Sequence, residues 1–303
     1  MIKNYFKIAW RNLRKNKTFT FLNIIGLSVA FGVAILLSMT AFFELSYDKF
    51  HKVDDLYMVY SSEQTPEGSS VGFSKPVPFA DALKAEMPGV ANISRYLTQN
   101  SLVFHEGKEL SMETAFVDPD FFSMFSFPII RGNAENPLKN KSSVVITKEA
   151  AKKLFGNTKV VGETFTLLLN GDKKPFVIGA VLEEFPSQSS LDFELAVDFS
   201  NSPGYAENRN RWDSSTHQVY MQLGEGTSVS EFETKSHSFT KLHFKDRIEN
   251  AKQDGAQPNE KGYYKSLRLL PFEDVHFADF EGKTVEVSRT YPYLILGIAL
   301  LIL

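Results

Sequence analysis

The 303-residue sequence contains no cysteine, which excludes disulfide bonds and thiolate chemistry. Its formal net charge is only −3 at pH 7, so it lacks the electrostatic footprint of a nucleic-acid-binding protein. Two catalytic signatures are also missing, the G-x-x-x-x-G-K-[ST] phosphate loop and the H-E-x-x-H metal pair. These absences argue against ATP binding by a phosphate loop in this chain and against a zinc hydrolase, and we predict no catalytic, cofactor-binding or metal site.

Charge is absent from one long stretch, residues 18–43, which is 26 residues of mostly apolar sequence. As a helix it would be about 39 Å long, enough to cross a hydrocarbon layer of about 30 Å. A cleaved signal peptide is the alternative, but the apolar part of a signal runs only about 7 to 15 residues. We therefore predict a transmembrane helix.

The segment before this run, residues 1–17, is basic and has no acidic residue. Its cations recur at helical spacing, whereas Phe6, Trp10 and Leu13 share another face. This pattern predicts an amphipathic helix at the cytoplasmic membrane surface, because basic flanks resist translocation. The predicted membrane-interface anchor consists of Lys3, Lys7, Trp10, Arg11, Arg14, Lys15 and Lys17. A disordered basic tail is the alternative.

The C-terminal residues 291–303 are apolar again, but 13 residues are too few for a bilayer that needs about 20. They are either a tail packed in a soluble core or the start of a second transmembrane helix. We favour the second interpretation, since an exposed Leu/Ile-rich end would promote aggregation. The chain would then be the N-terminal part of a longer multi-pass protein.

Residues 44–290 have the patterns of an α+β domain. Strands are predicted at residues 53–60, 93–104, 110–117, 144–146, 163–169, 175–182, 193–199, 217–223 and 264–270. Helices are predicted at 76–87, at 148–155 between a Thr147 cap and Gly156, and at 229–244 with Phe232, Phe239 and Leu242 in the core. Asn170-Gly171 indicates a tight hairpin, Asp118 is expected to cap a short Phe-rich helix, and residues 200–215 to form a mobile loop.

The strand–helix–strand pattern occurs twice, at 53–104 and 193–270, on either side of a β-rich stretch. We predict a ferredoxin-like part, residues 44–110 and 188–285, with a β-rich inserted subdomain at 111–187.

Polar side chains that could carry function are few. Glu44, Asp48 and His51 follow the apolar run at spacings near one helical turn. They predict either a polar cluster at the membrane surface or simple solvation of a helix end. His237 and His243 fall on opposite faces of their predicted helix, and Glu183-Glu184 lies in a predicted loop, so both pairs are interpreted as structural.

Several phrases, spread over nearly the whole chain, resemble one family. Residues 7–17 (KIAWRNLRKNK), 19–27 (FTFLNIIGL) and 44–51 (ELSYDKFH) resemble FtsX-like ABC transporter permeases. Residues 121–125 (FFSMF) with 131–133 (RGN), 143–147 (SVVIT), 150–156 (AAKKLFG) and 178–186 (IGAVLEEFP) are similar to the MacB-like periplasmic core domain.

This resemblance implies a non-catalytic permease subunit in a bacterial inner membrane, with a large periplasmic domain. It implies a cytoplasmic ABC ATPase as partner, which would hold ATP and Mg²⁺, and a homodimer or pseudo-dimer of permease halves. A further periplasmic partner is compatible with it. The implied activity is efflux or mechanotransmission, and the segment Glu44, Ser46, Asp48, Phe50 and His51 is the expected coupling element. A membrane-anchored extracytoplasmic sensor and an anchored periplasmic hydrolase are the alternatives.

Overall fold

The computed structural model describes residues 2–51, 55–278 and 288–303, so the predicted start of the first strand, at residue 53, lies outside the described residues. The chain divides into two compact units. We call residues Met1–Tyr47 with Glu286–Leu303 the helical unit, and Asp48–Val285 the core unit.

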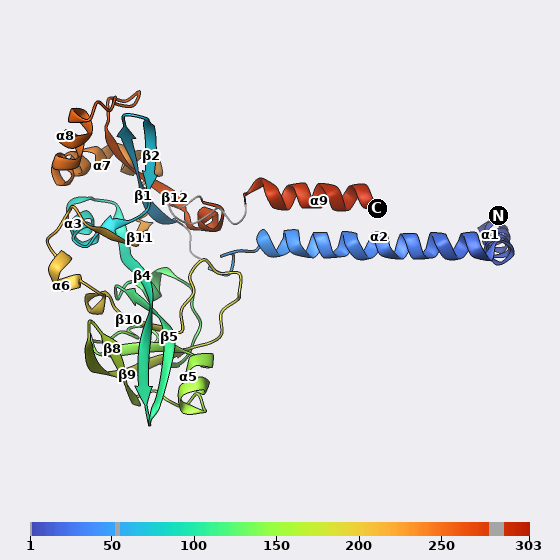
Figure 1. Cartoon of the computed structure of the whole chain (residues 1–303), viewed down its shortest axis with the longest axis horizontal. Helices are drawn as coiled ribbons and strands as arrows, with labels where there is room; N and C mark the ends of the chain where they lie inside the picture. The colour runs from blue at the N-terminus through green and yellow to red at the C-terminus, as the bar shows by residue number, and fades with distance from the viewer. Residues whose placement is uncertain (1, 52–54, 279–287) are drawn as a thin grey trace. The chain divides into compact units, whose positions relative to one another are not determined.

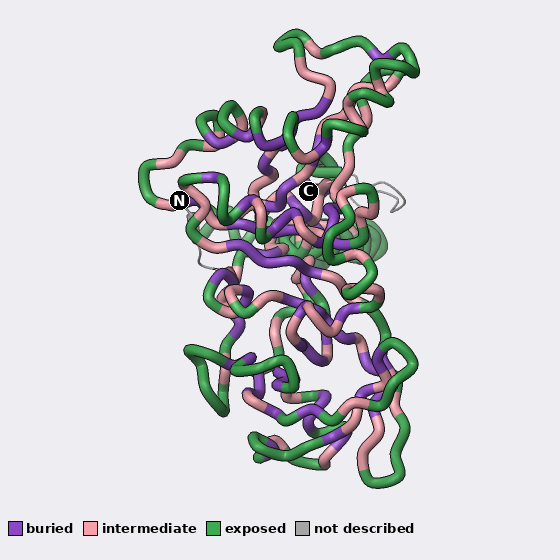
Figure 2. Tube along the Cα trace, turned by 90° about the vertical axis from the view of Figure 1, so that its left-hand side faces the viewer, coloured by how far each residue is buried: buried purple, intermediate pink, exposed green. Residues whose placement is uncertain are grey.

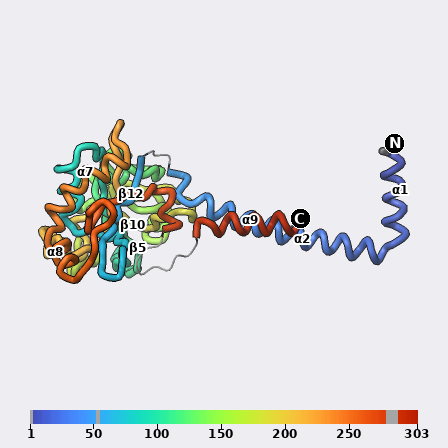
Figure 3. The backbone as a smooth tube through the Cα atoms, turned by 90° about the horizontal axis from the view of Figure 1, so that it is seen from above, coloured from blue at the N-terminus to red at the C-terminus, as the bar shows by residue number. Residues whose placement is uncertain are grey.

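The helical unit contains α1 (Ile2–Lys15), α2 (Lys17–Glu44) and α9 (Thr290–Ile302). Within the described residues, α2 is the one helix long and apolar enough to cross a membrane. Figure 3 shows that α1 turns away from the axis of α2, and the turn occurs at Asn16, between the two helices. Figure 1 shows α9 lying along α2, where small residues such as Ala34 and Ala41 of α2 are buried. The thirteen-residue α9 therefore packs on the long apolar helix.

The core unit begins with a four-stranded antiparallel layer of β1 (Leu56–Thr65), β4 (Val90–His105), β11 (Ser215–Leu223) and β12 (Lys265–Pro271). Its order is β12-β1-β11-β4. Alternate residues of these strands, such as Val59 and Leu267, pack with Phe79 of α3 (Phe79–Glu86) and Phe239 of α7 (Val229–His243). These two helices therefore cover one face of the layer.

A closed barrel of six strands adjoins this layer. Around the barrel, each strand pairs with the next in the order β4, β5 (Lys108–Val117), β10 (Leu195–Asp198), β7 (Ser143–Thr147), β9 (Asp172–Leu182) and β8 (Thr164–Leu169), and β8 pairs again with β4. The β5–β10 and β7–β9 pairs are parallel, so the barrel is mixed. Buried aliphatic side chains such as Val103, Ile146 and Leu167 fill it.

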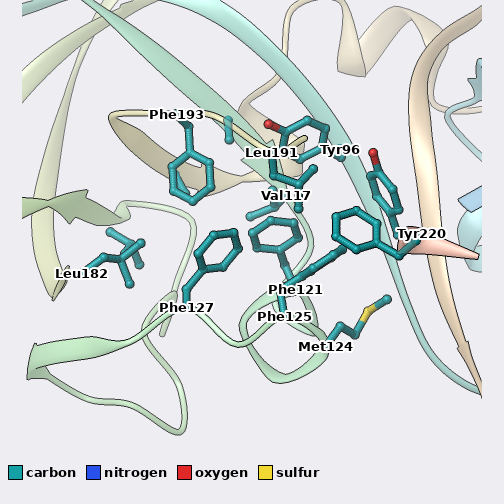
Figure 4. Close-up of a cluster of buried hydrophobic side chains, with 14 of the residues drawn as sticks. Tyr96, Val117, Phe121, Met124, Phe125, Phe127, Leu182, Leu191, Phe193 and Tyr220 are labelled. Carbon is teal, nitrogen blue, oxygen red and sulfur yellow. The ribbon is translucent and has the colours of Figure 1, made fainter. Parts of the chain in front are cut away.

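The sixteen-residue strand β4 belongs to both substructures. Its residues 90–96 pair with β11 in the layer, and its residues 96–105 pair with β5 in the barrel. Buried positions follow the strands through the core unit (Figure 2). Between layer and barrel lies a group of six buried rings that we call the aromatic cluster (Figure 4). Its members are Tyr96, Phe121, Phe125, Phe127, Phe193 and Tyr220.

The remaining described elements are short or lie at the edges. They are β2 (Gly68–Gly72), β3 (Lys75–Pro76), α4 (Phe121–Met124), β6 (Ile129–Gly132), α5 (Lys148–Phe155), η1 (Phe199–Asn201), α6 (Tyr205–Asn208), α8 (Lys245–Gln253) and η2 (Phe272–Phe277).

Local signals that depend on neighbouring residues are confirmed. The Thr147 hydroxyl accepts the Ala150 N–H at the start of α5, and Gly156 ends this helix in the left-handed conformation at φ +75°. Asn170 and Gly171 both have positive φ and join β8 to β9 in a two-residue turn.

Three predictions from the sequence are wrong, those for Asp118, Pro76 and Leu242. Asp118 does not cap α4, because its carboxylate accepts hydrogen bonds from Arg95, 23 residues away. Pro76 belongs to β3, so α3 begins only at Phe79. Leu242 is 68% exposed because α7 turns it away from the sheet, whereas Phe232 and Phe239 are buried as predicted.

Residues 200–215 contain part of η1 and all of α6, so they are not a plain loop.

Candidate functional site

The predicted coupling segment crosses the boundary between the two units. Glu44 is the last residue of α2, and the Ser46 hydroxyl donates to the Phe43 carbonyl at 2.7 Å in the helical unit. Asp48, Phe50 and His51 belong to the core unit. The structure therefore brings the last three residues into one site, which we describe within the core unit.

Asp48 is a buried carboxylate, 2% exposed, on backbone with φ +59°. Its Oδ1 accepts the Ser190 N–H at 2.7 Å and its Oδ2 accepts the Ser190 hydroxyl at 2.6 Å. The Asp48 N–H donates to the Gln188 carbonyl at 3.0 Å. Burial raises the pKa of the Asp48 carboxyl, and the two bonds from Ser190 oppose that rise. Asp48 thus ties the first residue of the core unit to the loop between β9 and β10.

His51 ties the same segment to a second loop. Its Nδ1 accepts the Ser126 N–H at 3.1 Å, so the neutral ring carries its proton on Nε2. Within the described part of the chain, the buried Nε2 has no hydrogen-bond partner. Burial lowers the pKa of His51 to about 4, because the charged imidazolium would lose its hydration among apolar rings.

Aromatic rings surround the His51 imidazole. The ring centroids lie 3.9 Å from Phe50, 5.3 Å from Phe125, 5.0 Å from Phe127 and 5.3 Å from Phe272. Phe125 and Phe127 belong to the aromatic cluster, and Phe272 begins η2, the last described element of the core unit. The segment that begins the core unit and the segment near its end therefore meet at His51.

Two features bear on catalytic chemistry in the described residues. No group of three or more His, Asp or Glu residues suited to a metal ion occurs in the described ranges. Residues 68–72 spell the letters of the G-x-S-x-G pattern, but they form strand β2 rather than a strand-to-helix elbow. The Ser70 hydroxyl there donates to the Glu63 carbonyl at 3.5 Å, across the β1–β2 pair.

The predicted membrane-interface residues lie on exposed helix surface. Six of the seven are in α1, and Lys17 is the first residue of α2. All seven side chains are exposed, and the Arg14 guanidinium lies 5.4 Å from the centre of the Trp10 ring. The six residues of α1 therefore share one helix, and Lys17 follows the turn at Asn16.

The other polar groups have structural partners. Glu183 pairs with Lys148 at 2.5 Å, and this pair lowers the pKa of the Glu183 carboxyl. His243 binds Glu86 at 2.9 Å and stacks on Trp212, which holds residues 209–214 against α7. His237 stacks on Tyr263 with a centroid distance of 3.7 Å.

Three residues of the site escaped the sequence analysis. Ser190, Ser126 and Phe272 lie 139, 75 and 221 positions from His51. No sequence pattern predicts the hydrogen-bond partner of a serine in a loop. Only the folded structure therefore identifies Ser190 and Ser126 as partners of Asp48 and His51.

Comparisons with known proteins agree on one family. The family model described as the MacB-like periplasmic core domain matches residues 20–236. The chain is 24% identical over 204 residues to the uncharacterized ABC transporter permease YvrN of Bacillus subtilis (strain 168), covering 62% of this chain and 48% of YvrN. The chain thus spans about half the length of the curated relative that it matches.

Among solved structures, a domain of a provisionally assigned permease protein from Porphyromonas gingivalis superposes with a TM-score of 0.59. Its sequence identity is 22%, over 72% of this chain and 90% of that chain. The periplasmic region of MacB from Actinobacillus actinomycetemcomitans gives a TM-score of 0.44 and 13% identity, over 72% and 90% of the two chains. At these identities the first of the two structures supports the fold alone.

Proposed function

The chain belongs to the family of the MacB-like periplasmic core domain, and from this premise we propose that it is the permease subunit of an ABC transporter of the MacB/FtsX type. The core unit would lie in the periplasm and α2 would cross the inner membrane, in a multi-pass protein. The subunit would not be catalytic itself, and a cytoplasmic ATPase would bind ATP and Mg²⁺. Two permease halves would form the assembly. The exposed, charge-free surface of α2 supports the membrane assignment.

We also propose that the four-stranded layer is the ferredoxin-like part of this domain. Its strands β1, β4, β11 and β12 alternate with α3 and α7 as two strand–helix–strand units. The order β12-β1-β11-β4 interleaves the two units, which is the arrangement of a split β-α-β fold.

The observation that carries the coupling proposal is the pair of contacts made by Asp48 and His51. These residues follow the end of α2 by only four and seven positions. A shift of α2 would pull directly on the Ser190 and Ser126 backbone, because no long flexible linker stands between the helix and these bonds. The aromatic cluster next to His51 is close-packed, and close-packed interiors transmit strain instead of absorbing it. Nucleotide binding by the ATPase would thus change the conformation of the core unit through the hydrogen bonds of Asp48 and His51.

The experiment is to co-purify the complete protein with its ATPase and to compare nucleotide turnover in the wild type and in Asp48→Asn. Asparagine tolerates positive φ, so the backbone is kept while the charge is lost. We expect the permease-dependent part of turnover to fall by roughly tenfold, equivalent to about 1.4 kcal/mol of lost coupling. Asp172→Asn, at an exposed position on the β8–β9 hairpin, is the matched control and should leave turnover unchanged.

Two results would contradict the proposal. If no ATPase co-purifies, the permease assignment fails. If the complex forms but Asp48→Asn has normal turnover, the permease assignment stands and the coupling role of Asp48 is lost.

A further inference from the structure

Half-exposed and exposed apolar side chains border the aromatic cluster on the loops that Asp48 and His51 hold and at the start of the short strand β6. We call this set the apolar rim, and it consists of Phe122, Pro128, Ile129, Ile130, Phe185 and Pro186. Ile130 is 40% exposed, and Phe122, Ile129 and Phe185 are partly buried against the cluster. Exposed apolar side chains gathered beside one buried cluster indicate contact with something other than water.

The rim is bound closely to the segment that follows the membrane helix. Phe50 contacts Phe127 with a centroid distance of 6.2 Å, and Phe127 contacts Phe185 at 5.2 Å and Phe122 at 6.4 Å. The Ser126 and Ser190 bonds fix both rim loops to residues 48–51. The rim therefore stays with Asp48 and His51 as one packed body.

The length of chain between α2 and this body is short. Only three residues lie between Glu44 and Asp48, and the four steps along the chain span at most about 14 Å when fully extended. The apolar run, about 39 Å as a helix, exceeds a hydrocarbon layer of about 30 Å, so its end reaches the headgroup layer. Residue 48 is consequently held within reach of lipid headgroups whatever the orientation of the core unit.

Charges of both signs lie next to the rim in the sequence. Lys49, Arg131 and Glu184 are exposed, whereas Glu183 is paired with Lys148 and Asp120 with Lys84. Apolar rings and aliphatic side chains flanked by cations are the composition of segments that lie at a membrane interface.

From these observations we propose that the apolar rim rests in the headgroup and upper acyl region of the periplasmic leaflet. The rim then forms a second membrane contact besides α2, made by folded loops of the core unit. This inference rests on the proposed membrane span of α2 but not on the ATPase partnership. Lipid contact would hold the rim in place, so that a shift of α2 would act on the Asp48 hydrogen bonds and would not simply move the whole core unit.

These 303 residues contain no cysteine, so with any cysteine elsewhere in the complete protein replaced by serine, one introduced thiol is the sole labelling site. Ile130→Cys would be labelled with an environment-sensitive fluorophore, and the complete protein placed in nanodiscs of phosphatidylethanolamine and phosphatidylglycerol. Spin-labelled lipid in the headgroup or upper acyl region then serves as the quencher. Val71→Cys on β2 is the matched control, since Val71 is 39% exposed and equally aliphatic, and Leu242→Cys on α7 is a second one.

We expect quenching at residue 130 to exceed that at residues 71 and 242 by roughly threefold or more, with a blue-shifted emission. Equal quenching at the three positions would overturn the proposal. So would strong energy transfer between donor- and acceptor-labelled copies at residue 130 without lipid quenching, because a second copy would then cover the rim. Unchanged Trp212 emission, measured on unlabelled protein in a Trp10→Phe background, confirms folding of each variant, and ATPase measurements play no part in the result.

Discussion

Two buried carboxylates of the core unit, Asp118 and Asp48, differ in the groups that donate hydrogen bonds to them. Asp118 is bound by a charged guanidinium, whereas Asp48 is bound by uncharged groups. Asp118 accepts Arg95 Nη2 at 2.6 Å, Arg95 Nε at 2.9 Å and the Arg95 backbone N–H at 2.8 Å. The guanidinium also donates to the Val77 carbonyl at 3.1 Å and stacks on Phe199 at 4.6 Å. Asp48, by contrast, receives its side-chain hydrogen bonds from the uncharged groups of Ser190.

This difference defines two kinds of connection. We call the Arg95–Asp118 ion pair the fixed joint, and the hydrogen bonds of Asp48 and His51 to their loops the releasable joint. Arg95 lies on β4 where this strand passes from layer to barrel, and an ion pair with full hydrogen bonding is costly to open there. Asp48 holds its loop with two hydrogen bonds from Ser190 and His51 with one from Ser126, and all three come from uncharged donors, so each costs less to lose. Motion of α2 would thus be expected to act at Asp48 and leave the layer–barrel junction intact.

The largest effect should come from breaking the fixed joint. Asp118→Asn leaves the buried Arg95 guanidinium with one remaining counter-ion, the exposed Asp81 at 3.2 Å, so we expect the free energy of unfolding to fall by about 3–5 kcal/mol. Guanidinium unfolding in detergent, followed by Trp212 emission in a Trp10→Phe background, measures it. Asp120→Asn is the control, because Asp120 pairs with Lys84 at the surface and its loss should cost below about 1 kcal/mol. Equal losses in the two variants would remove the distinction.

The second effect is a loss of stability in acid that comes from His51. Its pKa is about 4 in the folded protein against 6.5 when unfolded, so between these values only the unfolded chain binds the proton. Stability should therefore be intact above pH 6.5 and fall as the pH drops towards 4, by on the order of 3 kcal/mol in total.

His51→Gln isolates this contribution, because other groups titrate as well. His217, whose pKa burial lowers to about 3, acts in the same direction, and the raised pKa of Asp48 acts against it. The slope of unfolding free energy against pH should be shallower in the variant by up to about 1.4 kcal/mol per pH unit. Identical slopes between pH 6.5 and 4 would show that His51 is not held neutral.

The smallest effect should come from the releasable joint. Ser190→Ala removes one hydroxyl donor from Asp48 but keeps the backbone donor, so we expect a loss of about 0.5–1.5 kcal/mol. Ser187→Ala, at an exposed position in the same loop, should be neutral. A cost for Ser190→Ala as large as that for Asp118→Asn would mean that the two joints are equally rigid.

Features fixed by neighbours in the sequence could be predicted well. The charge-free run became α2 almost to the residue, since length and composition decide such a helix. The Asn170-Gly171 turn and the Thr147 cap follow from backbone preferences of the residues themselves.

Features fixed by distant partners could not be predicted. Closure of the barrel depends on the pairing of β4 with β8, which lies more than 60 residues later in the chain. The sequence of neither strand predicts this pairing. For the candidate site, the sequence indicated Asp48 and His51 as polar residues of interest. It gave no sign that Asp48 would be buried or that His51 would lie among phenylalanine rings, because burial is a property of the assembled core.

The continuity of β4 limits how this domain can be recombined with its relatives. A chimera that exchanges the barrel alone must be joined inside one strand, near Gln99, and again after β10. A donor barrel grafted there must present matching strand pairs on both sides of the join, or the register of the whole sheet shifts. Layer and barrel should for this reason be inherited together when the domain family diversifies.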